Sequence, residues 1–179
     1  MTSPRYDALV RLVDGRQPAC GTTKVLAVDG RSGAGKTRFT AGLAEATGAT
    51  VLHLDDVYPG WDGLAATPPM IADALSSVAV GDVGRVPRWS WVRDEPVSEL
   101  RVPPAPLLLL DGVGSGAATI RPYLSLLIWL DAPAAVRKAR ALARDGETYA
   151  PHWNRWAAQE DRLLAVEHTR SHADVVITT

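Results

Sequence analysis

The chain has 179 residues, of which 46% are hydrophobic and 22% charged, and its formal net charge is −1. This length and composition predict one globular domain over residues 1–179, and the near-neutral charge gives no basic field that would favour nucleic acid. The single cysteine, Cys20, excludes an intramolecular disulfide, and no apolar run is long enough to cross a bilayer. We therefore expect a soluble cytoplasmic protein with no nucleic-acid partner and no membrane partner.

Strands and helices alternate along the predicted secondary structure. A short helix over 6–13 comes before the apolar run 24–30, which ends in Asp-Gly as a buried strand would. The Ala-rich stretch 36–47 predicts a helix that ends at Gly48. Alternation of this kind predicts a parallel sheet with helices on both faces, although residues 81–106 fit neither element. The other predicted strands are 50–56, 106–112, 124–132 and 173–179, and the other helices are 68–80, 133–146 and 151–172.

Residues 28–37 read VDGRSGAGKT and directly follow the first long predicted strand. They fit the phosphate-loop pattern G-x-x-x-x-G-K-[ST] at every fixed position, in the strand–loop–helix context that the pattern requires. Glycines let successive backbone N–H groups point inward around an anion, and the following helix adds its positive end. We expect Lys36 to reach the terminal phosphates and Thr37 to place its hydroxyl on Mg²⁺. The residues predicted to bind the nucleotide are Gly30, Arg31, Ser32, Gly33, Ala34, Gly35, Lys36 and Thr37.

Two further strand ends carry carboxylates. The run LLLLDG ends in Asp111, which we expect to hold Mg²⁺ through water, as a Walker-B aspartate does. The run HLDDVY places Asp55 and Asp56 after the second strand, and ligands of open α/β sheets bind at the carboxyl ends of strands. Adjacent strand residues point to opposite sides, so only one of the two is expected to face the phosphates. We assign Asp55 as the general base for an acceptor hydroxyl, with Asp56 as the alternative.

These motifs, in this order, make the chain resemble the uridine kinase branch of the P-loop kinases, which includes nucleoside, nicotinamide riboside and pantothenate kinases. The resemblance rests on GRSGAGKT, on LDDVY in place of the family's Asp-x-Phe-Tyr, on LLLLDGV in place of its strand ending Glu-Gly-Ile, and on the Arg-rich helix VRKARALARD. It implies an α/β P-loop NTPase fold with a five-stranded parallel sheet of order 2-3-1-4-5 and a helical lid around 137–156. It also implies ATP and Mg²⁺ as cofactors, Tyr58 near the acceptor, and Arg137, Arg140 and Arg144 near the phosphates.

The three arginines of the predicted lid helix recur at spacings of three and four residues, so they are expected to share one helix face. On such a face, Arg140 and Arg144 would stabilise charge on the transferring phosphoryl group, and Arg137 would bind the nucleotide. The alternative is a solvated basic face. Arg155, further along the chain, is another lid candidate.

Tryptophans and arginines mark the segments expected beside the acceptor. Trp61, Trp89 and Trp91 could stack on a planar base or sugar face, or they could pack a loop-rich region. The stretch PRWSW at 87–91 stands in place of the family's Pro-x-Tyr-Asp-Phe, so Ser90 replaces an aspartate that would hold ribose hydroxyls more strongly. The substrate residues we predict are Asp55, Tyr58, Trp61, Trp89 and Arg88.

Several functions fit these motifs. The leading interpretation is an ATP-dependent kinase of a hydroxylated small molecule, nucleoside-like first. A vitamin-like alcohol or a nucleoside monophosphate is an alternative acceptor, since Arg85, Arg88 and Arg93 could bind a phosphate. A GTPase-type switch is a second class, although the guanine-reading N-K-x-D is absent, and a nucleotide-binding module without catalysis is a third. ATP is preferred to GTP by analogy alone, and the assembly is left open between a monomer and a homodimer.

Overall fold

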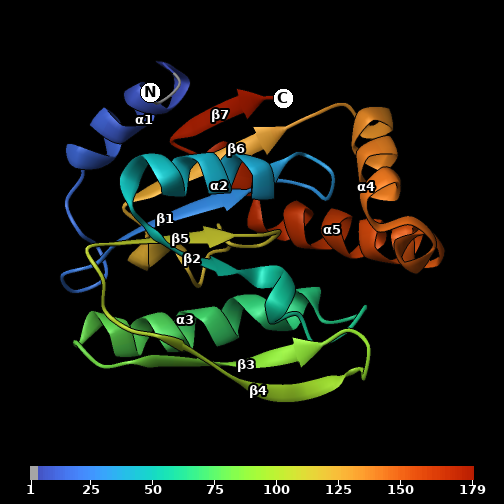
Figure 1. Cartoon of the computed structure of the whole chain (residues 1–179), viewed down its shortest axis with the longest axis horizontal. Helices are drawn as coiled ribbons and strands as arrows, with labels where there is room; N and C mark the ends of the chain where they lie inside the picture. The colour runs from blue at the N-terminus through green and yellow to red at the C-terminus, as the bar shows by residue number, and fades with distance from the viewer. Residues whose placement is uncertain (1–3) are drawn as a thin grey trace.

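A five-stranded parallel sheet forms the centre of the computed structural model, which describes residues 4–179 apart from the side chains of residues 4, 5, 145, 147 and 148 (Figure 1). Its strand order is β2-β5-β1-β6-β7, and every neighbouring pair runs parallel. Counted among these five strands alone, the order is 2-3-1-4-5, so the expected topology is confirmed. The strands span Lys24–Asp29 (β1), Thr50–His53 (β2), Leu107–Asp111 (β5), Leu126–Asp131 (β6) and Val175–Thr178 (β7).

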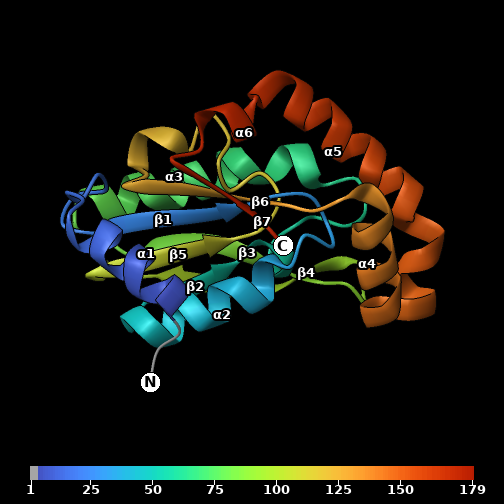
Figure 2. The same ribbon diagram turned by 90° about the horizontal axis from the view of Figure 1, so that it is seen from above.

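Helices cover both faces of this sheet, and successive residues of one strand alternate between the two sides. In β1, Leu26 and Val28 pack in one core cluster with residues of α1 and α2, whereas Val25 packs in the other with residues of α3 and α5. Figure 2 shows α1 and α2 on one side of the sheet and α3, α5 and α6 on the other. Covered strands need no polar face, which explains the continuous apolar runs in the sequence. The helices span Pro4–Asp14 (α1), Lys36–Thr47 (α2), Thr67–Ala79 (α3), Ala134–Tyr149 (α4), Trp153–Glu167 (α5) and Thr169–His172 (α6).

Residues 81–106, whose sequence fits neither a helix nor a strand of the main sheet, contain an antiparallel hairpin. Its strands are β3, Gly84–Ser90, and β4, Glu95–Val102, and they pair apart from the main sheet. The hairpin lies along α3 (Figure 1), where Gly84 approaches so closely that a Cβ atom would come within 2.4 Å of the Ala74 carbonyl oxygen. A register shift between Arg88 and Trp89 breaks the regular pairing near its tip.

The second parallel strand is shorter than predicted. The strand expected over 50–56 ends at His53, and Leu54–Asp56 form a 3-10 turn, η1. The turn is closed by the amides of Val57 and Tyr58, which both donate to the Leu54 carbonyl, at 2.9 and 3.1 Å. The strand alternation assumed for Asp55 and Asp56 therefore does not apply to them.

The predicted helix over 151–172 is divided. Residues Ala150–His152 form a 3-10 turn, η4, and α5 ends at Glu167 because His168 adopts a left-handed conformation with φ of 49°. Before it, α4 carries a break at Gly146, with φ of 53°. Two more 3-10 turns, Leu64–Ala66 (η2) and Arg121–Tyr123 (η3), connect other elements. Within residues 4–179, no helix has the length and apolar character needed to cross a membrane.

Candidate active site

The predicted phosphate loop forms a tight glycine turn between β1 and α2. Gly30, Gly33 and Gly35 have φ values of 145°, 80° and 88°, a region that strains other residues. A Cβ atom on Gly33 would lie 2.1 Å from the Arg137 carbonyl oxygen, so the loop packs directly against the start of α4. The strand, glycine turn and helix that the motif requires are all present, and Ala34 at the centre of the turn is buried.

The end of the loop leaves the first amides of α2 available. Gly35 at the N-cap has no side chain to bond them, and the uncapped N-terminus of a helix is suited to an anion. Lys36 Nζ bends back and donates to the carbonyl oxygens of Gly30 and Arg31, at 2.8 and 3.2 Å. Thr37 lies exposed on the first turn of α2. The Lys36 ammonium group therefore lies against the glycine turn, and Thr37 directly follows it in α2.

A buried carboxylate that the sequence analysis missed holds the loop from the side of α5. Glu160 is 1% exposed, and its Oε1 accepts a hydrogen bond from the Ser32 amide at 2.8 Å. The Ser32 carbonyl in turn accepts from Arg137 Nη1 at 3.3 Å. Two helices, α4 and α5, thus fix the middle of the phosphate loop through one residue.

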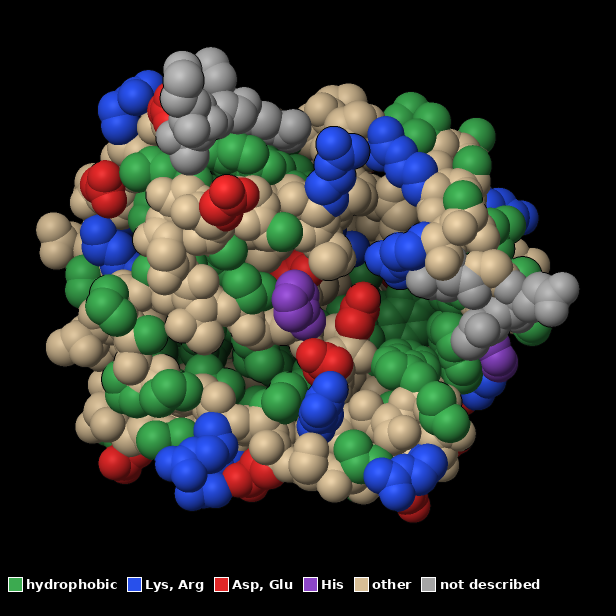
Figure 3. Space-filling view, viewed as in Figure 1, with side chains coloured by type: hydrophobic (Ala, Val, Ile, Leu, Met, Phe, Trp, Pro, Cys, Tyr) green, Lys and Arg blue, Asp and Glu red, His purple; other side chains and the backbone are tan. Residues whose placement is uncertain are grey.

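A cavity of about 550 Å³ opens beside the loop. Figure 3 shows on this face a hollow lined by hydrophobic side chains and bordered by acidic and basic ones. Both Asp55 and Asp56 line it, because the 3-10 turn does not alternate its side chains as a strand would. The predicted choice of one carboxylate over the other is thus not settled by backbone direction. The lining residues are Ser32, Asp55, Asp56, Tyr58, Trp61, Trp91, Arg144, Tyr149 and Trp156.

Asp55 is the carboxylate whose chemistry its surroundings alter. Its side chain is exposed at the cavity. Desolvation by the surrounding protein raises the pKa of Asp55, since it disfavours the charged form; the positive charge of Lys36 opposes the rise and the negative charge of Asp111 adds to it. A raised pKa brings a carboxylate nearer to the range in which it exchanges a proton with a hydroxyl-bearing substrate.

Asp111, the predicted metal ligand, is almost fully buried, at 3% exposure. Its Oδ2 lies 2.9 Å from His53 Nδ1, and parallel pairing of β2 with β5 sets the two residues side by side. This hydrogen bond is the main cause that raises the pKa of His53. Asp111 Oδ1 finds no hydrogen-bond partner in the part of the chain that the structure describes. A buried carboxylate oxygen left without a partner fits a hard cation such as Mg²⁺.

Aromatic rings make up much of the cavity wall. Trp61 stacks on His152, with ring centroids 4.2 Å apart, and lies 4.8 Å from Trp91. Trp156, which is 4% exposed, meets Tyr58 edge to face at 4.9 Å. The hydroxyl of the predicted substrate residue Tyr58 is already used, since it donates to the Val113 carbonyl at 2.9 Å. The hydroxyl hydrogen of Tyr58 is therefore not available to donate to a molecule in the cavity.

The hairpin brings a different tryptophan into the cavity from the one we predicted. Trp91 lines the cavity and its Nε1 donates to the Asp55 carbonyl oxygen at 2.7 Å. Trp89 is not among the lining residues, and its buried Nε1 has no partner among the described residues. Arg88, also predicted to bind the substrate, is exposed at the rim, where its Nη2 lies 4.0 Å from Asp56 Oδ1. Trp91 is thus the side chain of β3 and its turn that holds Asp55.

The three arginines of α4 reach three different places. Arg144 lines the cavity, where its charge lowers the pKa of Asp55. Arg140 Nη1 donates to Thr179 Oγ1 at 3.0 Å, and that hydroxyl donates to the Ala34 carbonyl, also at 3.0 Å. Arg137 donates to the Ser32 and Ala132 carbonyl oxygens. Of the three, Arg137 bonds the phosphate loop directly, Arg140 reaches it through Thr179, and Arg144 lies in the cavity.

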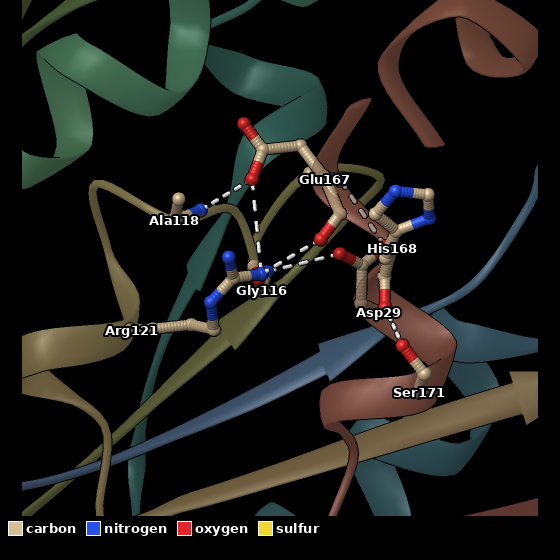
Figure 4. A network of polar contacts seen from close by, with 8 residues as sticks. Asp29, Gly116, Ala118, Arg121, Glu167, His168 and Ser171 are labelled. Carbon is tan, nitrogen blue, oxygen red and sulfur yellow. Dashed lines mark hydrogen bonds and ion pairs between the residues drawn. The ribbon is translucent and has the colours of Figure 1, made fainter. Parts of the chain in front are cut away.

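A second buried carboxylate that the sequence analysis missed joins β1 to the loop after β5. Asp29 Oδ1 accepts from the amides of Gly30 and Gly114, at 2.6 and 3.1 Å, and Oδ2 accepts from Gly116 at 2.9 Å. Figure 4 shows the same loop tied to the end of α5, where Ala118 donates to Glu167 Oε2 and Arg121 bonds the Gly116 and Glu167 carbonyls. Asp29 thereby fixes the strand end that carries Asp111 relative to the phosphate loop.

The Asp29 carboxylate should make stability depend on pH. Complete burial raises its pKa to about 6, from 3.8, despite three amide donors and the charge of Lys36. The folded state therefore holds the Asp29 proton more tightly than the unfolded state does. The resulting contribution to the free energy of unfolding, about 3 kcal/mol, is complete below pH 4 and is lost as the pH rises through 6. Urea unfolding of wild type and Asp29→Asn from pH 4 to pH 7 measures this. The stability difference in favour of the wild type should grow toward pH 4, and a difference independent of pH would contradict the assignment.

Comparisons with known proteins identify the fold. No family model and no curated protein sequence matches the chain. A structure described as a possible uridine kinase from Bacillus stearothermophilus has a TM-score of 0.68 at 19% identity, covering 97% of each chain. A structure assigned as a fructose transport system kinase from Silicibacter sp. TM1040 has a TM-score of 0.64 at 18% identity, covering 99% of this chain and 98% of that chain. Shikimate kinase from Acinetobacter baumannii, in complex with shikimate, has a TM-score of 0.52 at 18% identity, covering 90% of this chain and 86% of that chain. These likenesses confirm the P-loop kinase fold that the motifs predicted.

Proposed function

We propose that this protein transfers the terminal phosphoryl group of ATP to a hydroxyl group of a small molecule, in the manner of a uridine kinase. One observation carries the proposal: the cavity that holds Asp55 also contains Ser32 of the phosphate loop. An acceptor in this cavity would meet the phosphate loop on one side and a carboxylate of raised pKa on the other. General-base assistance and phosphate binding are the two requirements of a kinase site.

Each polar side chain of the site has a role in this proposal. Asp55 orients the acceptor hydroxyl and accepts its proton. Lys36, Arg140 and Arg144 offset the negative charge on the transferring phosphoryl group, and Arg137 keeps the loop in shape through Ser32. Thr37 and Asp111 would hold Mg²⁺, whose chemistry is to bridge phosphate oxygens and neutralise their charge. We also propose that α4 and η4, around residues 137–156, act as the lid of this site.

The acceptor is proposed to be an uncharged hydroxylated molecule with a planar part, such as a nucleoside. The rings of Trp61, Trp91 and Trp156 offer apolar contact area, and a volume of about 550 Å³ suits a molecule of that size. The hairpin arginines give less support to a monophosphate acceptor. Arg85 is paired with Glu99, and Arg93 lies 3.7 Å from Glu95.

Trp91 is expected to act on catalysis by holding Asp55. Replacing Trp91 with Phe keeps a ring in the wall but removes the 2.7 Å hydrogen bond to the Asp55 carbonyl. We expect kcat to fall about fivefold, the value of one hydrogen bond, with the KM for ATP unchanged. Trp89→Phe is the matched control, because Trp89 lies outside the cavity lining. Equal kcat values for the two variants would argue against a positioning role for Trp91.

The proposal is tested by ADP release from Mg·ATP with and without candidate acceptors. Nucleosides, nucleoside monophosphates and vitamin-like alcohols form the panel, and GTP replaces ATP in a parallel series. Stimulation by one acceptor supports the kinase and names its substrate class. Hydrolysis that no acceptor accelerates, and that Asp55→Asn does not affect, would instead support an NTPase switch.

A further inference from the structure

A second cavity, of about 430 Å³, lies between the phosphate loop, the end of β6 and the turn from α5 into α6. It shares no lining residue with the Asp55 cavity. Arg31 of the loop, Asp131 at the end of β6, Arg137 of α4, and Thr169 and Arg170 of α6 form its polar walls. The proposed kinase reaction gives this cavity no role, and its identity as a site does not depend on that reaction.

Positive charge dominates these walls. Three arginines line the cavity against a single carboxylate, Asp131, whose Oδ2 lies 3.3 Å from Arg170 Nε. Arg31 pairs at 2.5 Å with Asp161, which is 66% exposed and is not a lining residue. Within the part of the chain that the structure describes, Arg137 donates only to the Ala132 and Ser32 backbone carbonyls, and no carboxylate lies within salt-bridge distance of it. Three guanidinium groups and one carboxylate in the lining favour an oxyanion, which guanidinium groups bind with paired hydrogen bonds.

Two buried polar atoms in the same walls have no partner. Thr169 is 1% exposed and Trp129 is 4% exposed, and both line the cavity. Neither Thr169 Oγ1 nor Trp129 Nε1 finds a hydrogen bond within residues 4–179 as described. Buried donors are rarely left unpaired unless an occupant or an ordered water completes them. Their presence beside the arginines is an observation independent of the charge.

We propose that this cavity binds the phosphate group of a small molecule at a second site, on the side of the phosphate loop where Arg31 lies and away from the Asp55 cavity. The arginines hold the phosphate, and the apolar surface of Leu164, Ala132 and the Trp129 ring contacts the rest of the molecule. The volume exceeds that of a phosphate ion and falls in the range of small-molecule sites. Arg170 binds phosphate directly, whereas Asp131 weakens binding by repulsion and by its pairing with Arg170.

Titration of the ¹⁵N-labelled protein with inorganic phosphate tests the proposal. The Trp129 indole N–H, identified with Trp129→Phe, reports the cavity, and the Gly35 amide reports the phosphate loop. Arg170→Gln should raise the apparent Kd for phosphate read from the Trp129 signal by about tenfold or more. The apparent Kd read from the Gly35 amide should change by less than about twofold. Arg101→Gln, an exposed arginine of the hairpin, is the matched control and should change neither.

A variant of opposite sign keeps the test independent of folding defects. Asp131→Asn should tighten phosphate binding at Trp129, which mere damage to the wall would not do. The proposal is overturned if phosphate leaves the Trp129 signal unmoved, if Arg170→Gln responds like the wild type, or if Asp131→Asn weakens binding. An acetate titration at equal ionic strength separates phosphate from carboxylate ligands, and an equal response to acetate would contradict the phosphate assignment.

Discussion

Replacing Asp55 with Asn is expected to lower acceptor-dependent turnover about 10²- to 10⁴-fold, the range lost with a general base. Asn keeps the size of the side chain but cannot accept the proton of the acceptor hydroxyl. Desolvation raises the pKa of Asp55, and the Trp91 indole bonds its backbone carbonyl. Binding of Mg·ATP, measured by calorimetry, should stay close to that of the wild type, because Asp55 is not part of the phosphate loop.

Asp56→Asn is the matched control for this experiment. Asp56 lines the same cavity but lies toward Arg88 at the rim. We expect it to lose much less turnover than Asp55→Asn. The reverse order of the two losses would make Asp56 the base and contradict the assignment of Asp55, and little loss in both variants would contradict general-base catalysis from this turn.

Replacing Lys36 with Met is the second large effect, with an expected loss of about 10²- to 10³-fold in kcat. The Lys36 ammonium group lies at the mouth of the glycine turn, where it bonds the Gly30 and Arg31 carbonyls. Met keeps the length of the side chain but removes the charge that would offset the transferring phosphoryl group. Single-turnover kinetics at saturating ATP measure this loss apart from any change in nucleotide affinity.

Lys24→Met offers the control for Lys36. Lys24 Nζ also donates to two backbone carbonyls, those of Val13 and Asp14, but it lies at the opposite end of β1. Its replacement should leave kcat unchanged and affect only stability. Equal losses of kcat in the two variants would show that Lys36 acts through the fold rather than through charge at the phosphates.

The features that sequence could predict are those fixed by local pattern. The glycine spacing of residues 30–37 and the apolar runs of β1, β5 and β6 depend on near neighbours, and the parallel order follows from them by family resemblance. Asp55 and Asp111 were found because each follows an apolar run that ends at the same edge of the sheet. Asp29 likewise ends the apolar strand β1, so the same pattern could have singled it out. Its role could not be predicted, because two of its hydrogen-bond donors, the amides of Gly114 and Gly116, are 85 and 87 residues away.

Other features of the site depend on contacts between distant segments. Trp89 lies within β3, whereas Trp91 lies in the turn that follows it, and it is Trp91 that lines the cavity and bonds the Asp55 carbonyl. That contact joins residues 36 apart in sequence, so local pattern could not reveal it. The hairpin itself has no apolar run, because its exposed strand β4 faces solvent. Glu160 reads in sequence as an ordinary helix residue, and only the packing of α5 on the phosphate loop reveals its bond to Ser32.

The measurement that tests the central claim most directly follows the terminal phosphoryl group itself. The wild-type protein is incubated with Mg²⁺ and ATP labelled at the γ-phosphate, together with pools of hydroxylated small molecules, and the labelled products are separated and identified. We predict that the label appears on one organic acceptor and that Asp55→Asn abolishes this product. Label found only in inorganic phosphate, at a rate that no pool changes, would contradict the account.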